Sequence, residues 1–214
     1  RVAAARGLLA DGADKPLLAL SFSDARHGLV VGAFGLALAT VDGGRTWQSG
    51  MGLLPNRPGL HLYALARHGA NLYVAGEQGL LLRSRDGGAH FGALHGPHEG
   101  SYFAPTVFPG GRLLLGGLRG SLFASDDAGD SFQALPNPLP SSLNGMRVAG
   151  GQLLLANQAG MLLRSDLDTF AAQPLAVSDG LPLTAATIAA DGAIVAVGIA
   201  GAPLSQYLQM VERE

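Results

Sequence analysis

Short apolar segments alternate with clusters of Gly, Asp and Ser along most of the chain. The first regular set contains LLALSFS from Leu17, GLVVGA from Gly28, LALATV from Leu36 and a short segment that begins at Thr46. Apolar runs of this length, bounded by turn-forming residues, are typical of β-strands. Their order and the short connections predict a four-stranded antiparallel meander.

The same order of segments returns further along the chain. We expect an all-β fold with four-stranded units at about residues 17–51, 60–95, 102–135, 143–175 and 183–208. Residues 1–16 have no period-two alternation and predict a short helix or an irregular lead-in. Residues 209–214 form a polar tail, and the predicted fifth unit lacks the closing turn of the others.

Two independent markers give the repeat the same period. Equivalent hydroxyl residues at positions 40, 84, 125 and 165 lie 44, 41 and 40 residues apart. Pairs of the form Gly-x-x-Gly precede them at residues 32–35, 76–79 and 117–120, with Asn157 to Gly160 and Gly198 to Gly201 as later members. Repeats of about 40 residues with four strands each are typical of propeller blades. The sequence therefore predicts a β-propeller with five blades in this chain.

The turn that closes each unit has a self-capping composition. Its hydroxyl and carboxylate accept backbone N–H bonds, its glycines take positive φ, and we expect its aromatic residue to fold into the core between blades. Because the turn recurs at a fixed period, its Asp residues are interpreted as structural rather than catalytic. The predicted structural residues are Thr40, Asp42, Gly44, Trp47, Ser84, Asp86, Gly88, Phe91, Ser125, Asp127, Gly129 and Phe132.

Composition narrows the function classes. The 214 residues are 48% hydrophobic and 14% charged, with a net charge of −2 that argues against nucleic-acid binding. No apolar run reaches the 18 or more residues of a membrane span. The absence of Cys excludes disulfides and thiol chemistry, and nothing in the sequence implies a metal or another cofactor.

The repeats also resemble a known family. Phe22-Ser23-Asp24, His27-Gly28, Thr40, Asp42-Gly43-Gly44 and Thr46-Trp47 are similar to Asp-box (BNR) repeats, and most similar to those of photosystem II stability and assembly factors. The resemblance covers about residues 17–200. Members typically have seven blades, so five blades predict either a fragment that lacks two or a smaller closed ring. The resemblance implies an exported location, in a periplasm or lumen.

Strand alternation assigns the loops to two ends of the blades. The Asp-box turns share one end with the loops between first and second strands. The Gly-x-x-Gly turns share the other end with the connections between blades, and propellers generally bind partners there. The predicted partner surface is Glu77, Gln78, Arg119, His98, Glu99 and Tyr102; further candidates at this end are Phe34, Arg57, His61, Asn137, Asn157, Gln158 and Asp179.

Several of these residues have alternative interpretations. Glu77 and Arg119 occupy equivalent turn positions, so a solvated ion pair between blades is the alternative to a partner contact. His95, His98 and Glu99 offer metal-ligand types, but in a Pro/Gly loop without a second pair of ligands. Ser21, Ser23, Asp24 and His27 contain the residue types of a hydrolytic triad crowded at one strand end, and we predict no catalytic residue among them.

Two functions from different classes follow from the resemblance. The first is a non-enzymatic scaffold that binds a membrane protein or a subunit of a complex through its loop face. The second is a sialidase-like glycoside hydrolase, which requires a carboxylate pair, and Glu77, Glu99 and Asp179 with Tyr102 are its candidates. Only Arg57 and Arg119 supply cations to that face, which disfavours a sialidase. A lectin-like module would need exposed aromatic residues, for which Phe34, Tyr102 and Tyr207 are the candidates.

Overall fold

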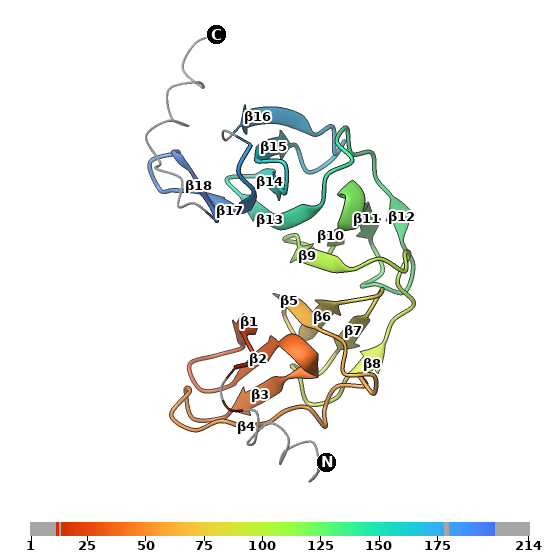
Figure 1. The fold of residues 1–214 in the computed structure, drawn as a ribbon, viewed down its shortest axis with the longest axis vertical. Helices are drawn as coiled ribbons and strands as arrows, with labels where there is room; N and C mark the ends of the chain where they lie inside the picture. Colours follow the sequence, from red (N-terminus) through yellow and green to blue (C-terminus); the bar gives the residue numbers. More distant parts are fainter. Residues whose placement is uncertain (1–11, 13, 178–179, 200–214) are drawn as a thin grey trace. The chain divides into compact units, whose positions relative to one another are not determined.

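The computed structural model describes residues 12, 14–177 and 180–199 (Figure 1). These residues form strands, turns and short 3-10 segments, with no α-helix among them. The chain divides into two compact units, here called unit 1, which ends at Glu99, and unit 2, which begins at Gly100. Each unit is built from antiparallel meanders, as the alternating pattern predicts.

Unit 1 contains two four-stranded sheets in simple consecutive order (Figure 1). Strand β5, the first strand of the second sheet, packs against β1 and β2 of the first. The core between the sheets is aliphatic and includes Leu29, Val31, Leu62, Leu72 and Val74. The strands are β1 (Leu17–Phe22), β2 (Gly28–Gly32), β3 (Ala37–Thr40), β4 (Gln48–Ser49), β5 (Leu62–His68), β6 (Asn71–Gly76), β7 (Leu81–Ser84) and β8 (Gly92–Ala93).

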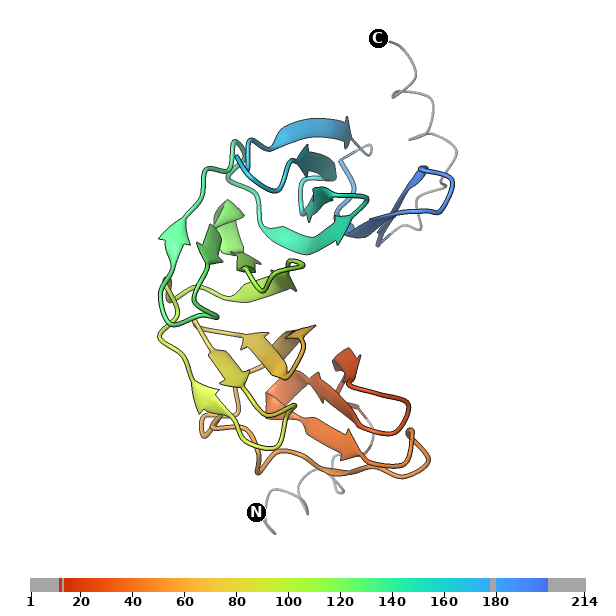
Figure 2. The ribbon, with the colours of Figure 1, turned by 180° about the vertical axis from the view of Figure 1, so that it is seen from behind.

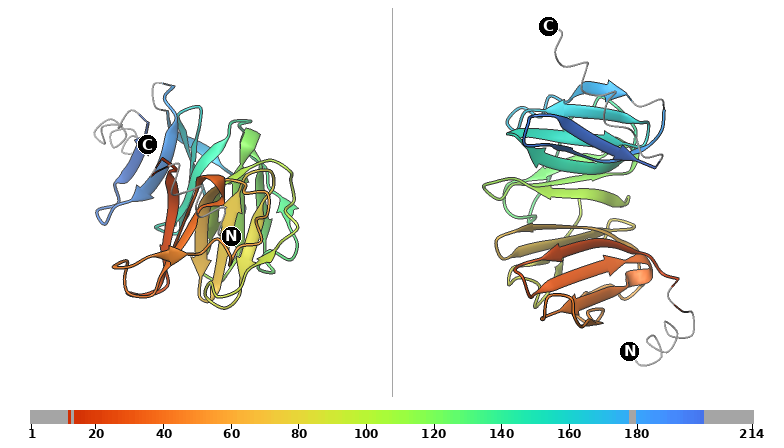
Figure 3. Two further views of the ribbon diagram at one scale, coloured as in Figure 1. Left: turned by 60° about the horizontal axis from the view of Figure 1, so that its bottom comes forward. Right: turned by 90° about the vertical axis from the view of Figure 1, so that its left-hand side faces the viewer.

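Unit 2 repeats this architecture, with two four-stranded sheets side by side and one further hairpin (Figure 2). The first strands again face one another: β13 packs against β9, and β17 packs against β13 (Figure 3). The strands are β9 (Tyr102–Val107), β10 (Leu113–Gly117), β11 (Leu122–Ser125), β12 (Gln133–Ala134), β13 (Leu143–Ala149), β14 (Gln152–Asn157), β15 (Met161–Ser165), β16 (Gln173–Val177), β17 (Leu183–Ile188) and β18 (Ile194–Gly198).

The predicted fold class is confirmed, and all four complete meanders lie where the repeats place them. The fifth unit is present among the described residues as the β17–β18 hairpin. Its predicted third strand near residues 202–208, and the predicted polar tail, lie outside the described residues. The predicted lead-in also lies outside them, except for Gly12 and residues 14–16.

The first glycine of each Gly-x-x-Gly pair allows two backbone segments to meet. The sheets are numbered as blades in chain order: β1–β4 form blade 1, β5–β8 blade 2, β9–β12 blade 3, β13–β16 blade 4 and β17–β18 blade 5. In blade 2, a Cβ on Gly76 would collide with the carbonyl oxygen of His61. The N–H of the next residue, Glu77, donates to this same carbonyl at 3.0 Å. In the other blades, the N–H of the residue after the second strand likewise donates to the carbonyl of the residue before the first strand. The glycine therefore makes room for the hydrogen bond that begins each blade.

The second glycine belongs to a type I′ turn. In blade 3, Arg119 lies at φ 55° and ψ 29°, and Gly120 follows at φ 75°. Two central residues with positive φ suit the twist of a hairpin, but this conformation normally favours Asn or Gly at both positions. Phe34 and Gln78 take the same left-handed conformation in blades 1 and 2. In blades 1, 2 and 3 the turn thus places one residue in a conformation that its own side chain disfavours.

We expect Arg119→Asn to raise the free energy of unfolding, because Asn tolerates the left-handed region that costs most residues roughly 1–2 kcal/mol. Urea denaturation should show a gain of up to about 1 kcal/mol. The neighbouring Gly120→Ala serves as the matched opposite, because its Cβ would collide with the carbonyl oxygen of Leu139 at φ 75°. A loss of stability in Arg119→Asn would contradict the assignment of strain to this turn.

Candidate functional site

The Asp-box turns form closed hydrogen-bond networks at one end of the blades. In blade 1, Thr40 Oγ1 donates to Asp42 Oδ1 at 2.8 Å and accepts the Gly44 N–H at 2.9 Å. The Thr46 N–H and hydroxyl both donate to the Asp42 carboxylate, at 2.9 and 2.5 Å. Ser84 and Asp86 repeat this arrangement in blade 2, and Ser125 and Asp127 repeat it in blade 3. Each carboxylate therefore serves its own turn.

These turns also tie two hairpins of one sheet together. The Gly43 N–H donates to the carbonyl of Arg26, and the Gly87 N–H donates to that of Ala70, at 2.9 and 2.8 Å. Both acceptors lie in the loop between a first and a second strand. The Asp-box turns and these loops thus occupy the same end of the blades, as strand alternation predicts.

The aromatic residues of the turns behave less uniformly than predicted. Phe170 is buried and stacks on Phe108 at 5.9 Å between ring centroids, as expected for a core residue. Trp47 remains 37% exposed. Its indole N–H donates to the Gly44 carbonyl at 3.1 Å, and its ring meets Phe22 edge-on. The prediction that Trp47 folds into the core was wrong, because the indole N–H finds its acceptor in its own turn.

The hydrogen bonds of the turns keep their carboxylates ionised. The hydroxyl and N–H of Thr46, followed by the Thr40 hydroxyl, lower the pKa of Asp42 from 3.8 to about 2. The pKa of Asp86 is lowered mainly by the His90 N–H, and that of Asp127 mainly by the Ser131 hydroxyl. Groups held ionised in this way are poor proton donors at neutral pH, which agrees with a structural role.

At the opposite end of unit 1, Glu77 is locked to a histidine. Its Oε2 accepts the His61 backbone N–H at 3.1 Å and lies 2.8 Å from His61 Nδ1. The His61 side chain and backbone contacts lower the pKa of Glu77. The His61 ring in turn meets Phe34, at 4.7 Å between centroids, and stacks near Tyr63. Phe34 is 56% exposed, so this end carries an open aromatic surface beside a fixed carboxylate.

Three further residues of the predicted partner surface stay exposed in unit 1. Gln78 projects from the turn at φ 52°, next to Gly79. A Cβ on Gly79 would lie 2.9 Å from the carbonyl oxygen of His98 and 3.2 Å from the Cα of Glu99. The turn and the connection after blade 2 are therefore neighbours. The structure brings together the predicted set Glu77, Gln78, His98 and Glu99.

Two residues of the predicted partner surface lie in unit 2, Arg119 and Tyr102, and one is exposed while the other is buried. Arg119 is exposed, and its backbone N–H donates to Ser142 Oγ at 3.2 Å. No carboxylate in the described part of unit 2 lies within ion-pair distance of its guanidinium. Tyr102 is fully buried at 0% exposure. Its placement on the partner surface was wrong, because Tyr102 begins strand β9 and turns its ring into the unit rather than toward the loop.

The residues of the alternative catalytic sites do not assemble into them. His27 Nδ1 lies 2.9 Å from Asp24 Oδ2, but Ser23 Oγ donates to the His27 carbonyl rather than to its ring. A glycosidase acid needs a raised pKa, whereas that of Glu77 is lowered; Tyr102 is buried, and Asp179 lies outside the described residues. Across the described ranges, no three His, Asp or Glu side chains are close enough to hold a metal ion.

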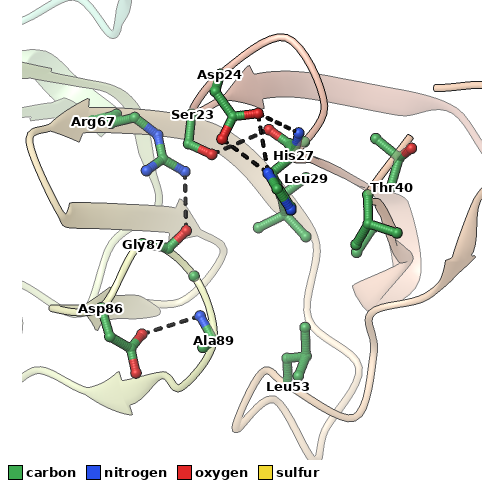
Figure 4. Close-up of a pocket in the computed structure, with 14 residues that line it drawn as sticks. Ser23, Asp24, His27, Leu29, Thr40, Leu53, Arg67, Asp86, Gly87 and Ala89 are labelled. Carbon is green, nitrogen blue, oxygen red and sulfur yellow. Dashed lines mark hydrogen bonds and ion pairs between the residues drawn. The ribbon is translucent and has the colours of Figure 1, made fainter. Parts of the chain in front are cut away.

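A cavity of about 480 Å³ lies at the Asp-box end of unit 1, between the two sheets (Figure 4). Its walls include Leu29, Ala39 and Leu53 on the blade 1 side and the Gly87-Gly88 turn of blade 2. Arg67, at the end of β5, reaches toward the Gly87 carbonyl, and Asp24 and His27 lie beside it (Figure 4). Sequence reasoning missed Arg67, because an Arg near a strand end normally indicates a solvated position.

Comparison with known proteins agrees with the repeat. Residues 9–96 match the family model described as photosynthesis system II assembly factor YCF48. The photosystem II assembly lipoprotein Ycf48 of Synechococcus sp. (strain CC9902) is 33% identical over 93 residues, which are 44% of this chain. This chain is a β-propeller whose residues 9–96 are similar to Ycf48. It spans 26% of the length of that relative.

Solved structures support the propeller fold of this chain. A structure of YCF48 bound to D1 peptide superimposes with a TM-score of 0.71 at 20% identity, covering 86% of this chain and 60% of the other. YCF48 from Cyanidioschyzon merolae gives 0.69 at 20% identity, covering 88% and 66%. A virginiamycin B lyase from Staphylococcus aureus gives 0.70 at 12% identity, covering 87% and 68%. Because an enzyme shares the fold, the fold alone does not decide between scaffold and catalyst.

Among the described residues, no helix is long and apolar enough to cross a membrane.

We expect the Asp-box turns to make the folded chain less stable at acidic pH. The folded pKa of Asp42 is about 2 and its ordinary value is 3.8, so the unfolded chain binds the proton first and stability is lost as pH falls. The urea midpoint should stay level above about pH 5 and fall between about pH 4 and 2.

A matched pair of variants tests this assignment. Asp42→Asn should reduce the fall, because the titrating carboxylate is gone. Thr46→Val removes the hydroxyl that contributes most to the lowered pKa, so its fall should be smaller and should end at a higher pH. A profile in Asp42→Asn with the same acid dependence as the unmodified chain would contradict the role of this carboxylate.

Proposed function

We propose that this chain is a non-enzymatic scaffold that binds a segment of a membrane protein through the Gly-x-x-Gly end of its blades. The observation that carries the proposal is the state of Arg119. Its guanidinium is exposed, is not paired with a carboxylate in the described part of unit 2, and stands on a turn in the left-handed region. An Arg kept in a disfavoured conformation on a rigid hairpin suits recognition better than stability.

The equivalent turn of blade 2, in unit 1, supports the same interpretation. Gln78 occupies the equivalent left-handed position in blade 2 and is exposed. Glu77 beside it is fixed by two contacts to His61, so its carboxylate is preorganised at the surface. Fixed polar groups lose little conformational entropy when a partner arrives. Gln78, His98 and Glu99 complete the proposed surface in unit 1.

The relatives indicate the kind of partner. The curated relative is a photosystem II assembly lipoprotein, and one solved YCF48 holds a D1 peptide. We infer a partner of the same kind here, an exposed segment of a membrane protein or of a complex subunit during assembly. A carboxylate on that segment fits Arg119, because a guanidinium binds a carboxylate through two parallel hydrogen bonds. The lipoprotein relative also supports an exported location for this chain.

Binding of a fluorescently labelled D1 peptide, followed by anisotropy, tests this proposal. Arg119→Gln should weaken binding by at least about tenfold, the effect of about 1.4 kcal/mol. Gln already occupies the equivalent position at Gln78, so thermal unfolding should be unchanged. Arg147→Gln is the matched control, because Arg147 is an exposed Arg on β13 of the same unit, outside the turn.

The possible outcomes test the scaffold role and the proposed binding surface separately. Binding that Arg119→Gln leaves unchanged would contradict the proposed surface but keep the scaffold role. A folded chain that binds neither the D1 peptide nor detergent-solubilised photosystem II subunits would contradict the scaffold role itself. Hydrolysis of a glycoside substrate by the same preparation would favour the enzyme class instead.

A further inference from the structure

Arg67 is a desolvated cation at the wall of the cavity at the Asp-box end of unit 1. Its Nε donates to Ser21 Oγ and its Nη2 donates to the Gly87 carbonyl, both at 3.3 Å. Both acceptors are neutral, and no carboxylate in the described part of unit 1 lies within ion-pair distance. Burial lowers the pKa of Arg67, and the more distant charge of Asp24 offsets this only in part. A half-buried guanidinium without a counter-ion favours an anion beside it.

An anionic group also faces the same cavity. The Asp24 carboxylate accepts the N–H groups of Arg26 and His27, at 2.7 and 2.9 Å, and contacts the His27 ring. These bonds lower its pKa to about 2, so it is charged at neutral pH. Asp86, in the second wall, is ionised as well. A ligand that carried only a carboxylate would therefore meet repulsion along with the attraction of Arg67.

Much of the remaining lining is aliphatic, beside the hydroxyl groups of Ser23 and Thr40. Leu29 and Ala39 come from neighbouring strands of blade 1, and Leu53 stands 38% exposed at the opposite side of the opening (Figure 4). A volume of about 480 Å³ lies within the range of small-molecule sites. The cavity thus combines one cation, two carboxylates and an aliphatic wall.

We propose that this cavity binds a free α-amino acid with an aliphatic side chain. The carboxylate pairs with the guanidinium of Arg67, the ammonium group lies toward Asp24, and the side chain packs against Leu29 and Leu53. Because the ligand is neutral overall, it pairs with Arg67 and with a carboxylate of the site without adding a net charge. The site lies at the end of the blades opposite the partner surface, so it goes beyond the proposed function.

Isothermal titration calorimetry at neutral pH with three probes of one shape tests the proposal. L-leucine carries both charged groups, leucinol lacks the carboxylate, and 4-methylpentanoate lacks the ammonium group. We expect L-leucine to bind at least about tenfold more tightly than either analogue, a difference of about 1.4 kcal/mol. The proposal is overturned if L-leucine does not bind, or if either analogue binds equally well.

Two variants assign the charges. Arg67→Gln should reduce the affinity for L-leucine at least tenfold and should strengthen the binding of leucinol, because the like charge near its ammonium group is removed. Asp24→Asn keeps a side-chain oxygen for the two backbone N–H groups. It should weaken the binding of L-leucine, because the partner of the ammonium group loses its charge. It should strengthen the binding of 4-methylpentanoate, because a like charge is removed. A purely structural Arg67 predicts equal losses for all three probes, and that result would overturn the assignment.

A third variant guards against loss of folding. Leu53→Ser changes a partly exposed side chain outside the sheets. It should weaken the binding of L-leucine and leave the weaker binding of glycine unchanged, because glycine has no side chain to pack against Leu53. Binding of D1 peptide provides an independent readout, because its surface shares no residue with the cavity. Intact peptide binding with unaltered L-leucine binding in all three variants would overturn the amino-acid site and leave the scaffold role standing.

Discussion

One backbone hydrogen bond recurs in every blade, and the rest of each blade depends on it. The carbonyl of the residue before the first strand accepts the N–H that follows the second strand, as between Pro16 and Ala33 at 3.0 Å. The two segments meet so closely that a side chain on the intervening position would collide, and Gly32 occupies it. The bond fixes where a blade begins, and it therefore fixes which end carries the turn and which end carries the Asp-box.

Blade 4 shows how strongly this constraint acts. Asn157 replaces the glycine there, is completely buried, and accepts the Met161 N–H through Oδ1 at 2.8 Å. Its Nδ2 is buried without a hydrogen-bond partner. The carbonyl of Ser142 nevertheless still receives the Gln158 N–H at 2.9 Å. The blade thus keeps the bond and accepts an unsatisfied amide, which is ordinarily unfavourable in a protein interior.

The sequence was sufficient for the parts of the structure that local chemistry determines. The strands, the Gly-x-x-Gly turns and the Asp-box networks follow from periodicity and from residues whose side chains act on their own backbone, as Thr40 and Asp42 do. The first strands also contain an irregularity that periodicity does not reveal. Pairing skips Tyr63 between Leu62 and Ala64, and the other first strands skip the equivalent residue. Such a bulge arises from the close approach of the preceding carbonyl, which only the folded register creates.

The candidate site was predictable only in part, for the same reason. Exposed turn residues such as Gln78 could be placed, because the turn itself was placed. Tyr102 could not be placed from the sequence. Its ring is buried or exposed depending on the residue at which the connection ends and β9 begins. Arg67 could not either, because its significance is a missing counter-ion, which depends on where blade 1 brings Ser21 and Asp24. Interactions between residues far apart in sequence were therefore the ones that sequence reasoning missed.

Strand β5 joins the two ends of unit 1 and raises the question of whether they communicate. His61, which holds Glu77, comes directly before β5, and Arg67 lies near its other end. Coupling between two sites requires an element with two arrangements that both ligands bias. β5 pairs with β6 from Leu62 to His68, with one bulge at Tyr63, and it packs on β1 and β2. Because these contacts hold β5 in one arrangement, a ligand at Arg67 and a partner at Glu77 should bind independently.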